Sequence, residues 1–172
     1  MSRDLLALAI ALVLAAAAQD LLPGLPGTPL KLPFLTGIAA YYALNRPVPV
    51  ALLAALAAGC LTDGAGGLPG GCTSVFLLLA GLGLRPLKRF LLDGSPAGVS
   101  VACAGLALLQ AVWQTAWVRL ALPGGAWQVV GGYALLLPSG AIAGAAAGFG
   151  AGLLDRLAGN VRPREEIRER GC

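Results

Sequence analysis

Charged side chains in this chain are confined to short patches that separate long apolar runs. Only 12% of the 172 residues are Asp, Glu, Lys or Arg, and 58% are hydrophobic; average globular domains carry about 25% charged residues. A soluble fold of this length needs a largely polar surface, and the mean hydropathy of +0.80 shows that this chain lacks one. We therefore predict an all-α polytopic membrane protein whose helices form one compact bundle.

Six apolar segments alternate with linkers rich in proline, glycine or charge. The expected membrane segments lie at about 5–22, 30–44, 48–62, 72–84, 97–118 and 127–154, so that residues 1–157 form the bundle and residues 158–172 a charged tail. Crossing a ~30 Å hydrocarbon core takes about 20 helical residues. Because 48–62 and 72–84 are shorter than this, five spans with one re-entrant segment are the alternative to about six spans.

Basic residues divide unequally between the two sides that alternating spans define. One side receives Arg3, Arg46, Arg85, Lys88, Arg89 and the five arginines of 156–172, and the other receives only Lys31 and Arg119. Short cytoplasmic loops carry the excess of Lys and Arg. The ten-to-two ratio predicts a multi-pass membrane protein with both termini cytoplasmic. The first segment is interpreted as a membrane helix and not a secretory signal, because Asp4 offsets Arg3.

This orientation is testable with a reporter that is active only in the cytoplasm. Fused after Cys172, the reporter is expected to be active, and inserted within residues 64–70 it is expected to be silent, because that linker falls on the side poor in basic residues. The reverse pattern of activity would show that the orientation is wrong.

Residues for catalysis or metal binding are scarce. The chain has no histidine, which is the commonest general base and metal ligand. No paired carboxylates or nucleophile–base arrangement stand out, and the glycine-rich stretch 64–71 lacks the Lys-Ser/Thr of a phosphate-binding loop. We predict a protein that is not an enzyme, with no catalytic residue, metal or cofactor. The four cysteines form no CxxC pair, and a Cys60–Cys72 disulfide across the loop is left open.

The basic tail does not resemble a nucleic-acid surface. Its arginines alternate with Glu165, Glu166 and Glu169, whereas a nucleic-acid-binding face gathers basic residues with aromatic side chains between them. We expect no nucleic-acid partner. A solvated tail and a contact with phospholipid headgroups are the two interpretations of this segment.

Polar side chains within the spans are few. Gln110, Gln114 and Thr115 lie within two turns of segment 97–118, with the two glutamines one turn apart on a common face, while Asp20, Asp63 and Asp155 lie near segment ends. Intramembrane polar groups either form hydrogen bonds between helices or serve a substrate or partner. For the three polar residues of segment 97–118, both contacts between helices and a substrate-lining role are hypotheses.

Glycine recurs every fourth residue in the last segment. Gly140, Gly144, Gly148 and Gly152 form a smooth stripe along one side of a helix. In lipid, such faces permit close packing of helices. The stripe predicts a covering helix, which belongs either to this chain or to a partner.

The linker that follows the third segment resembles a known family. It reads Gly59-Cys60-Leu61-Thr62-Asp63, then small residues, and ends in Gly70-Gly71 before another apolar segment. This Gly-x-x-x-Asp pattern with a later glycine is similar to that of the rod shape-determining MreD family of bacteria. The length of the chain, its short helices and its near lack of soluble parts also fit. The resemblance marks Gly59, Asp63, Gly70 and Gly71 as partner-binding or structural residues.

That resemblance implies a non-catalytic membrane scaffold of the cell-wall elongation machinery. Family members are thought to bind MreC and, with it, to link the MreB filament to the RodA-type polymerase and its transpeptidase, supporting peptidoglycan synthesis and cell shape. Their fold is similar to that of the substrate-binding subunits of energy-coupling-factor vitamin transporters. A vitamin-binding transporter subunit is therefore the alternative, although a small-molecule pocket needs convergent polar or aromatic groups and few are available. A membrane protein of another function is the third hypothesis.

Within the resemblance, Asp63 is the residue that we single out. At the carboxyl end of a helix, a carboxylate is unfavourably placed against the helix dipole. Three arrangements would offset this: a partner's donors, the amides of Gly64 to Gly67, or capping of the next helix.

Overall fold

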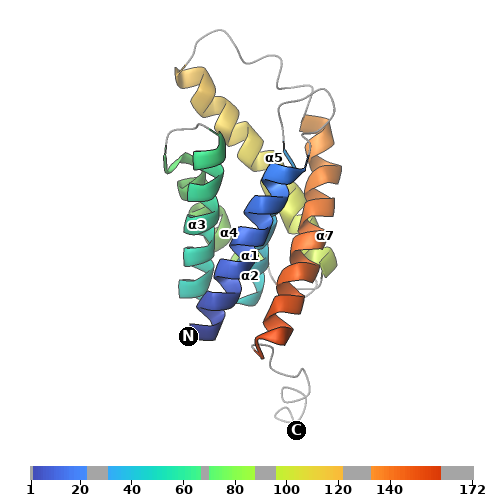
Figure 1. The fold of residues 1–172 in the computed structure, drawn as a ribbon. Coiled ribbons are helices and arrows are strands. Elements are labelled where there is room, and N and C mark those ends of the chain that lie inside the picture. The colour runs from blue at the N-terminus through green and yellow to red at the C-terminus, as the bar shows by residue number, and fades with distance from the viewer. Residues whose placement is uncertain (1, 23–30, 67–69, 88–95, 122–132, 160–172) are drawn as a thin grey trace.

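The computed structural model describes residues 2–22, 31–66, 70–87, 96–121 and 133–159, and in this part of the chain all regular structure is helical. The helices are α1 (Ser2–Leu21), α2 (Phe34–Asn45), α3 (Val48–Gly66), α4 (Cys72–Leu87), α5 (Pro96–Ala121) and α7 (Tyr133–Leu157). They run alternately up and down, so that the start of α1 and the end of α7 lie at the same end of the bundle (Figure 1). The prediction of an all-helical bundle is confirmed for these residues.

The short helix α2 forms the centre of the bundle. Its residues from Leu35 to Leu44 are all buried, and it contacts α1, α3, α4, α5 and α7. A helix that is apolar on every side is stable only where other apolar groups surround it. With 12 residues, α2 is about 18 Å long at 1.5 Å per residue, which is well short of a ~30 Å hydrocarbon core.

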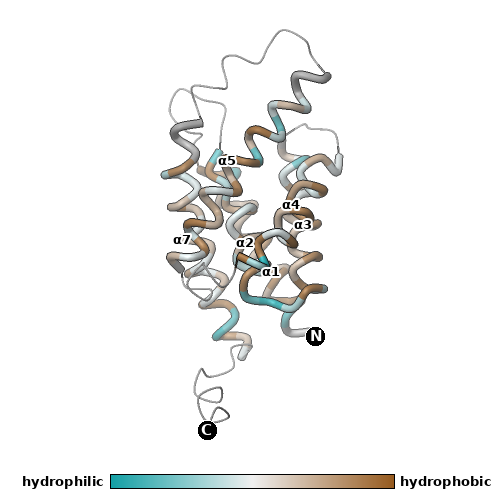
Figure 2. Tube along the Cα trace, turned by 180° about the vertical axis from the view of Figure 1, so that it is seen from behind, coloured by the Kyte–Doolittle hydropathy of each residue, from teal (hydrophilic) through white to brown (hydrophobic). Residues whose placement is uncertain are grey.

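Within the described residues, four helices are long and apolar enough to cross a membrane, with qualifying segments Asp4–Leu21, Val48–Ala65, Ala97–Trp117 and Leu137–Leu157. Large apolar side chains face outward, among them Leu6, Val13 and Phe149, and hydrophobic residues occur along the length of the bundle in Figure 2. In water this surface would be costly, whereas acyl chains match it. The architecture is compatible with a helical membrane protein.

Most of the predicted segment bounds agree with the helices to within a few residues. The two larger differences concern the second and third segments: α2 begins at Phe34 and not near residue 30, and α3 continues to Gly66 and not only to residue 62. Asp63 therefore lies in the last turn of α3. Residues 127–132 of the sixth segment and residues 160–172 of the tail lie outside the described residues.

Candidate functional site

Asp63 joins the end of α3 to the beginning of α4. Its side chain is only 2% exposed. Oδ2 accepts a hydrogen bond from the Gly71 amide at 2.9 Å, and the Thr73 amide lies 3.0 Å from Oδ1 and 3.1 Å from Oδ2. The Thr73 amide belongs to the first turn of α4 and the Gly71 amide lies just before it, where N–H groups lack partners within the helix. Of the three arrangements considered from the sequence, Asp63 therefore adopts the capping of the next helix.

The capping arrangement explains why the carboxylate is tolerated at the carboxyl end of α3. The amino end of α4 carries a partial positive charge that stabilises a carboxylate, and the two N–H partners compensate for its burial. Gly71 has a φ of +97°, a conformation that side chains disfavour, so a glycine is required where the chain turns toward Asp63. Gly70 is exposed, and a side chain there would meet open space.

Gly59 sets the distance between α3 and α4. A Cβ atom at this position would meet Ser74 Cα and would lie 2.5 Å from Ser74 N and 2.6 Å from Ser74 Oγ. Ser74 in turn donates a hydrogen bond to the Leu56 carbonyl at 3.3 Å and lies 3.4 Å from Cys60 Sγ. Gly59, Asp63 and Gly71 therefore build one tight corner between two helices.

The thiols near this corner are free. Cys60 is exposed, whereas Cys72 is buried, and the Cys72 carbonyl accepts a hydrogen bond from Trp113 Nε1 at 3.1 Å. The Cys60–Cys72 disulfide that the spacing left open is not formed in the structure.

The polar residues of α5 connect it to two other helices. Thr36 Oγ1 of α2 donates to Gln110 Oε1 at 2.7 Å, and Gln114 Nε2 donates to Thr73 Oγ1 of α4 at 3.1 Å. Thr115 donates to the Ala111 carbonyl of its own helix. Sequence reasoning identified the two glutamines but not their threonine partners, which a helical pattern alone does not distinguish from other small residues.

The glycine stripe of α7 packs mainly against α5 of the same chain. A Cβ at Gly140 would lie 2.8 Å from Ala104 Cα, and one at Gly144 would lie 2.6 Å from Cys103 Cβ. Gly148 faces Val99, while Gly152, at the end of the stripe, comes nearest to Tyr41 of α2. A neighbouring line of buried small residues on α7 receives α2, since a Cβ at Gly37 would lie 2.8 Å from Ala147 Cβ.

We expect Gly144→Leu to lower the yield of folded protein strongly, because the new side chain would drive α5 and α7 apart. Gly144→Ala is expected to be milder, but not neutral, because the Cβ alone lies 2.8 Å from Ser100 Cα. Gly150→Leu is the matched control, since a Cβ there has nothing within 4 Å. The measurement is the monodisperse fraction after detergent extraction; equal yields of the two leucine variants would contradict the packing role.

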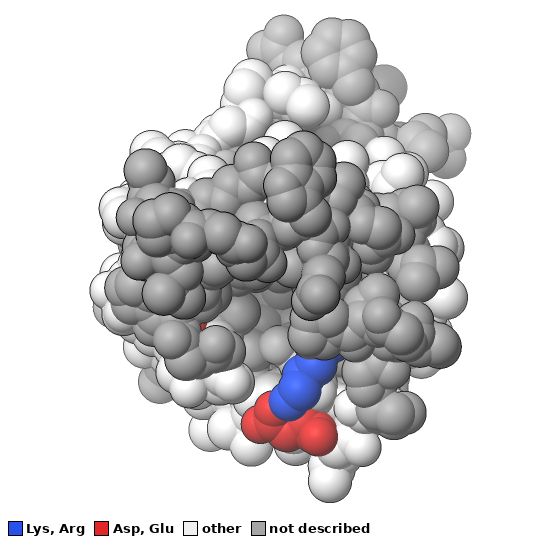
Figure 3. All heavy atoms as spheres, turned by 90° about the horizontal axis from the view of Figure 1, so that it is seen from above, with Lys and Arg blue, Asp and Glu red and all other residues white. Residues whose placement is uncertain are grey.

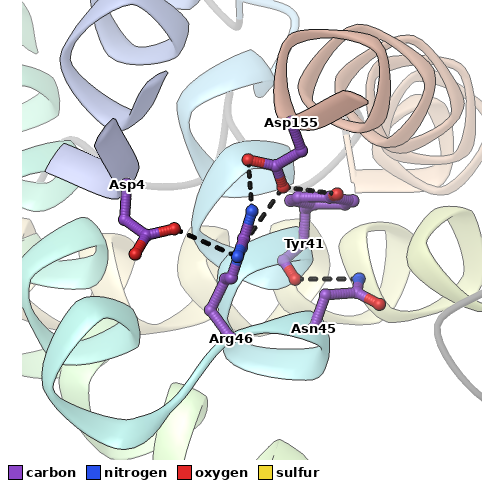
Figure 4. Close-up of polar contacts among 5 residues, drawn as sticks. All are labelled: Asp4, Tyr41, Asn45, Arg46 and Asp155. Carbon is purple, nitrogen blue, oxygen red and sulfur yellow. Dashed lines mark hydrogen bonds and ion pairs between the residues drawn. The ribbon is translucent and has the colours of Figure 1, made fainter. Parts of the chain in front are cut away.

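A partly buried ionic cluster joins α1, α2 and α7 (Figure 4), at the end of the bundle where α1 begins and α7 ends. Arg46, just after α2, contacts Asp155 of α7 through Nη2–Oδ1 at 2.5 Å and Nε–Oδ2 at 3.2 Å. Its Nη1 lies 3.1 Å from Oδ1 of Asp4 in α1. Tyr41 donates to Asp155 Oδ2 at 2.8 Å. We call these four residues the ionic cluster.

A second arginine lies next to the ionic cluster. Arg85, near the end of α4, donates from Nη2 to the backbone carbonyl of Arg46 at 3.0 Å, which joins α4 to the residue that follows α2. Burial lowers the pKa of Arg46, but its hydrogen bond and ion pair with Asp155, together with the charge of Asp4, outweigh this and raise that pKa above its ordinary value. Arg46 therefore stays charged, and the cluster holds α1, the end of α2, and α7 together.

Sequence reasoning noticed Asp155 at the end of its segment but did not predict the ionic cluster. Arg46 and Asp155 are 109 positions apart, and Arg46 was assigned to the basic side only as part of a count. The one available signal was that the two residues lie on the same predicted side of the membrane.

Among the residues that the structure describes, no group of three or more His, Cys, Asp or Glu side chains could hold a metal ion. Comparison of the chain with protein-family models, curated proteins and solved structures finds no match.

Proposed function

We propose that the chain is a non-catalytic membrane scaffold, similar to MreD, that holds an MreC-like partner within the cell-wall elongation machinery. Through that partner it would act with a RodA-type polymerase, its transpeptidase and MreB. The observation that carries the proposal is that polar side chains inside the bundle form hydrogen bonds between helices. Gln110, Gln114 and Asp63 all bind groups on neighbouring helices. These side chains are therefore occupied in holding the helices together and are not left open for a substrate, which suits a rigid support.

The corner of α3 and α4 supports the resemblance in a specific way. The resemblance depends on Gly59, Asp63 and Gly71, and all three lie at the junction of α3 and α4. Their role is to fix two helices, so the motif would preserve the shape of the scaffold and not itself touch a partner. Partner helices would instead contact outward apolar side chains such as those of α1.

The proposed topology places both termini in the cytoplasm and about six segments across the bacterial inner membrane. Arg46 contacts Asp4 near the start of α1 and Asp155 near the end of α7, and Arg85 contacts Arg46. Both arginines therefore lie at the end of the bundle where α1 begins and α7 ends, and an excess of basic residues is expected on the cytoplasmic side. On this proposal α2, too short to span alone, is completed by the residues that flank it.

One observation favours the alternative of a vitamin-binding transporter subunit. A pocket of about 340 Å³ opens between α1, α2 and α3, at the lower end of the ~300–1,000 Å³ usual for small-molecule sites. Its polar groups are few, however, and Gln110, Gln114 and Trp113 are not among its lining residues.

Removal of the chain from its native cells tests the proposal. We expect cells to become round and to lose peptidoglycan synthesis along the side wall, and the wild-type chain to restore both. The Gly150→Leu variant, in which the new side chain has open space, is expected to restore them equally. Cells that keep their shape but no longer take up a vitamin would overturn the scaffold in favour of the transporter subunit.

A further inference from the structure

The pocket between α1, α2 and α3 exists because the central helix is short. At the end of the bundle opposite the start of α1, α2 begins only at Phe34, while α1 continues to Leu21 and α3 to Gly66. The longer helices rise past the start of α2 and leave about 340 Å³ between them. The cavity therefore lies beside the outer turns of two membrane-spanning helices, where lipid can reach it.

The walls of the pocket change from apolar to polar toward the end of the bundle. Leu35, Ala16 and Leu61 line its apolar part, and Gln19 and Asp20 line its polar part. Asp20 Oδ1 forms an ion pair with Lys31 Nζ at 2.8 Å, and both side chains are well exposed. A basic and an acidic group touch at this end of the molecule in Figure 3. This order of apolar and charged groups matches a lipid tail beneath a charged headgroup.

The electrostatics of the rim favour a cationic headgroup beside the carboxylate. The last turns of α1 and α3 both line the pocket, and the carboxyl ends of helices carry partial negative charge. The opposing amino end of α2 is already bound, since the Leu35 amide donates to Gln19 Oε1 at 3.4 Å. Asp20 holds a primary ammonium group in the structure, that of Lys31.

We propose that this pocket binds one phospholipid with a zwitterionic headgroup that ends in a primary ammonium. The ammonium would take the place of Lys31 at Asp20, the released Lys31 would bind the phosphate, and the glycerol and upper acyl chain would fill the pocket beside Leu35 and Leu61. Both charges of the exposed ion pair are then satisfied by one ligand. This site is independent of the partners named above.

The test is lipid retention by the full chain, exchanged into nanodiscs with equal amounts of phosphatidylethanolamine, phosphatidylcholine and phosphatidylglycerol, and then analysed by native mass spectrometry. We expect one phosphatidylethanolamine per chain, retained about tenfold over the other two lipids. Asp20→Asn is expected to abolish the preference over phosphatidylcholine. Because Asp20 is exposed, this variant is expected to fold.

A pair of glycine variants separates the pocket from general lipid contact. Gly64 lines the pocket and Gly83 lies on α4 away from it; a Cβ at either position has nothing within 4 Å. Gly64→Leu is expected to lose the bound lipid, and Gly83→Leu to keep it. Three results would each overturn the proposal: equal retention of all three lipids, the same lipid retention by Gly64→Leu as by the wild-type chain, or a water-soluble molecule bound in place of the lipid.

Discussion

Gly59→Ala is expected to destabilise the bundle by about 3 kcal/mol or more, because its single added carbon overpacks a contact between two backbones. The new Cβ would lie 2.5 Å from Ser74 N, and neither helix can move away without breaking the hydrogen bonds of Asp63 to the first turn of α4. The effect is measured as the midpoint of thermal unfolding in detergent micelles.

Gly64→Ala is the matched control for this variant. It lies in the same helix, and its Cβ meets open space. Alanine is a better helix former than glycine by about 0.8–1 kcal/mol, so the control is expected to be slightly more stable than wild type. Two alanine substitutions in one helix are thus predicted to act with opposite signs; the same small change in both would show that α3 and α4 are not in close contact at Ser74.

Asp155→Ala is expected to cost about 3 kcal/mol, because it leaves a partly buried arginine with only Asp4 as its ion-pair partner. Asp155 is 1% exposed and holds Arg46 through two contacts as well as the Tyr41 hydroxyl. Asp20→Ala is the control, since it removes a carboxylate from an exposed ion pair, which is worth at most ~1 kcal/mol. Unfolding midpoints of the two variants give the comparison.

A double substitution distinguishes loss of an ion pair from loss of packing. Arg46→Met combined with Asp155→Leu removes both charges of this pair and is expected to recover part of the stability that Asp155→Ala loses. Apolar replacement of a buried pair is often neutral, but Asp4 and the Tyr41 hydroxyl each lose a partner. If the double variant is as unstable as Asp155→Ala, the charges themselves are required at this position.

The sequence predicted the helices well because apolar length and Pro/Gly linkers determine where a membrane helix can lie. It did not predict that α2 is central. A helix that is apolar on every side has the same pattern whether lipid or protein surrounds it, so the burial of Leu35 to Leu44 depends on the arrangement of the other helices.

For the candidate site, the sequence likewise identified residues but not the partners that they contact. The spacing of Gly59 and Asp63 indicated a specific corner, but the partners of Asp63 depend on the path of the following turn, where Gly71 reverses the chain. The glycine stripe required a covering helix without identifying α5. The ionic cluster was beyond reach, because charges 109 positions apart meet only once α2 and α7 are packed.

Co-purification from native membranes measures most directly whether the chain holds partners. Extracted gently from its own cells through a tag after Cys172, the wild-type chain is predicted to bring down MreC-like and RodA-type proteins in near-stoichiometric amounts. Gly150→Leu, which alters an open position on α7, provides a folded control for the tagged preparation. Recovery of an ATPase module together with a bound vitamin, and of no cell-wall protein, would contradict the scaffold.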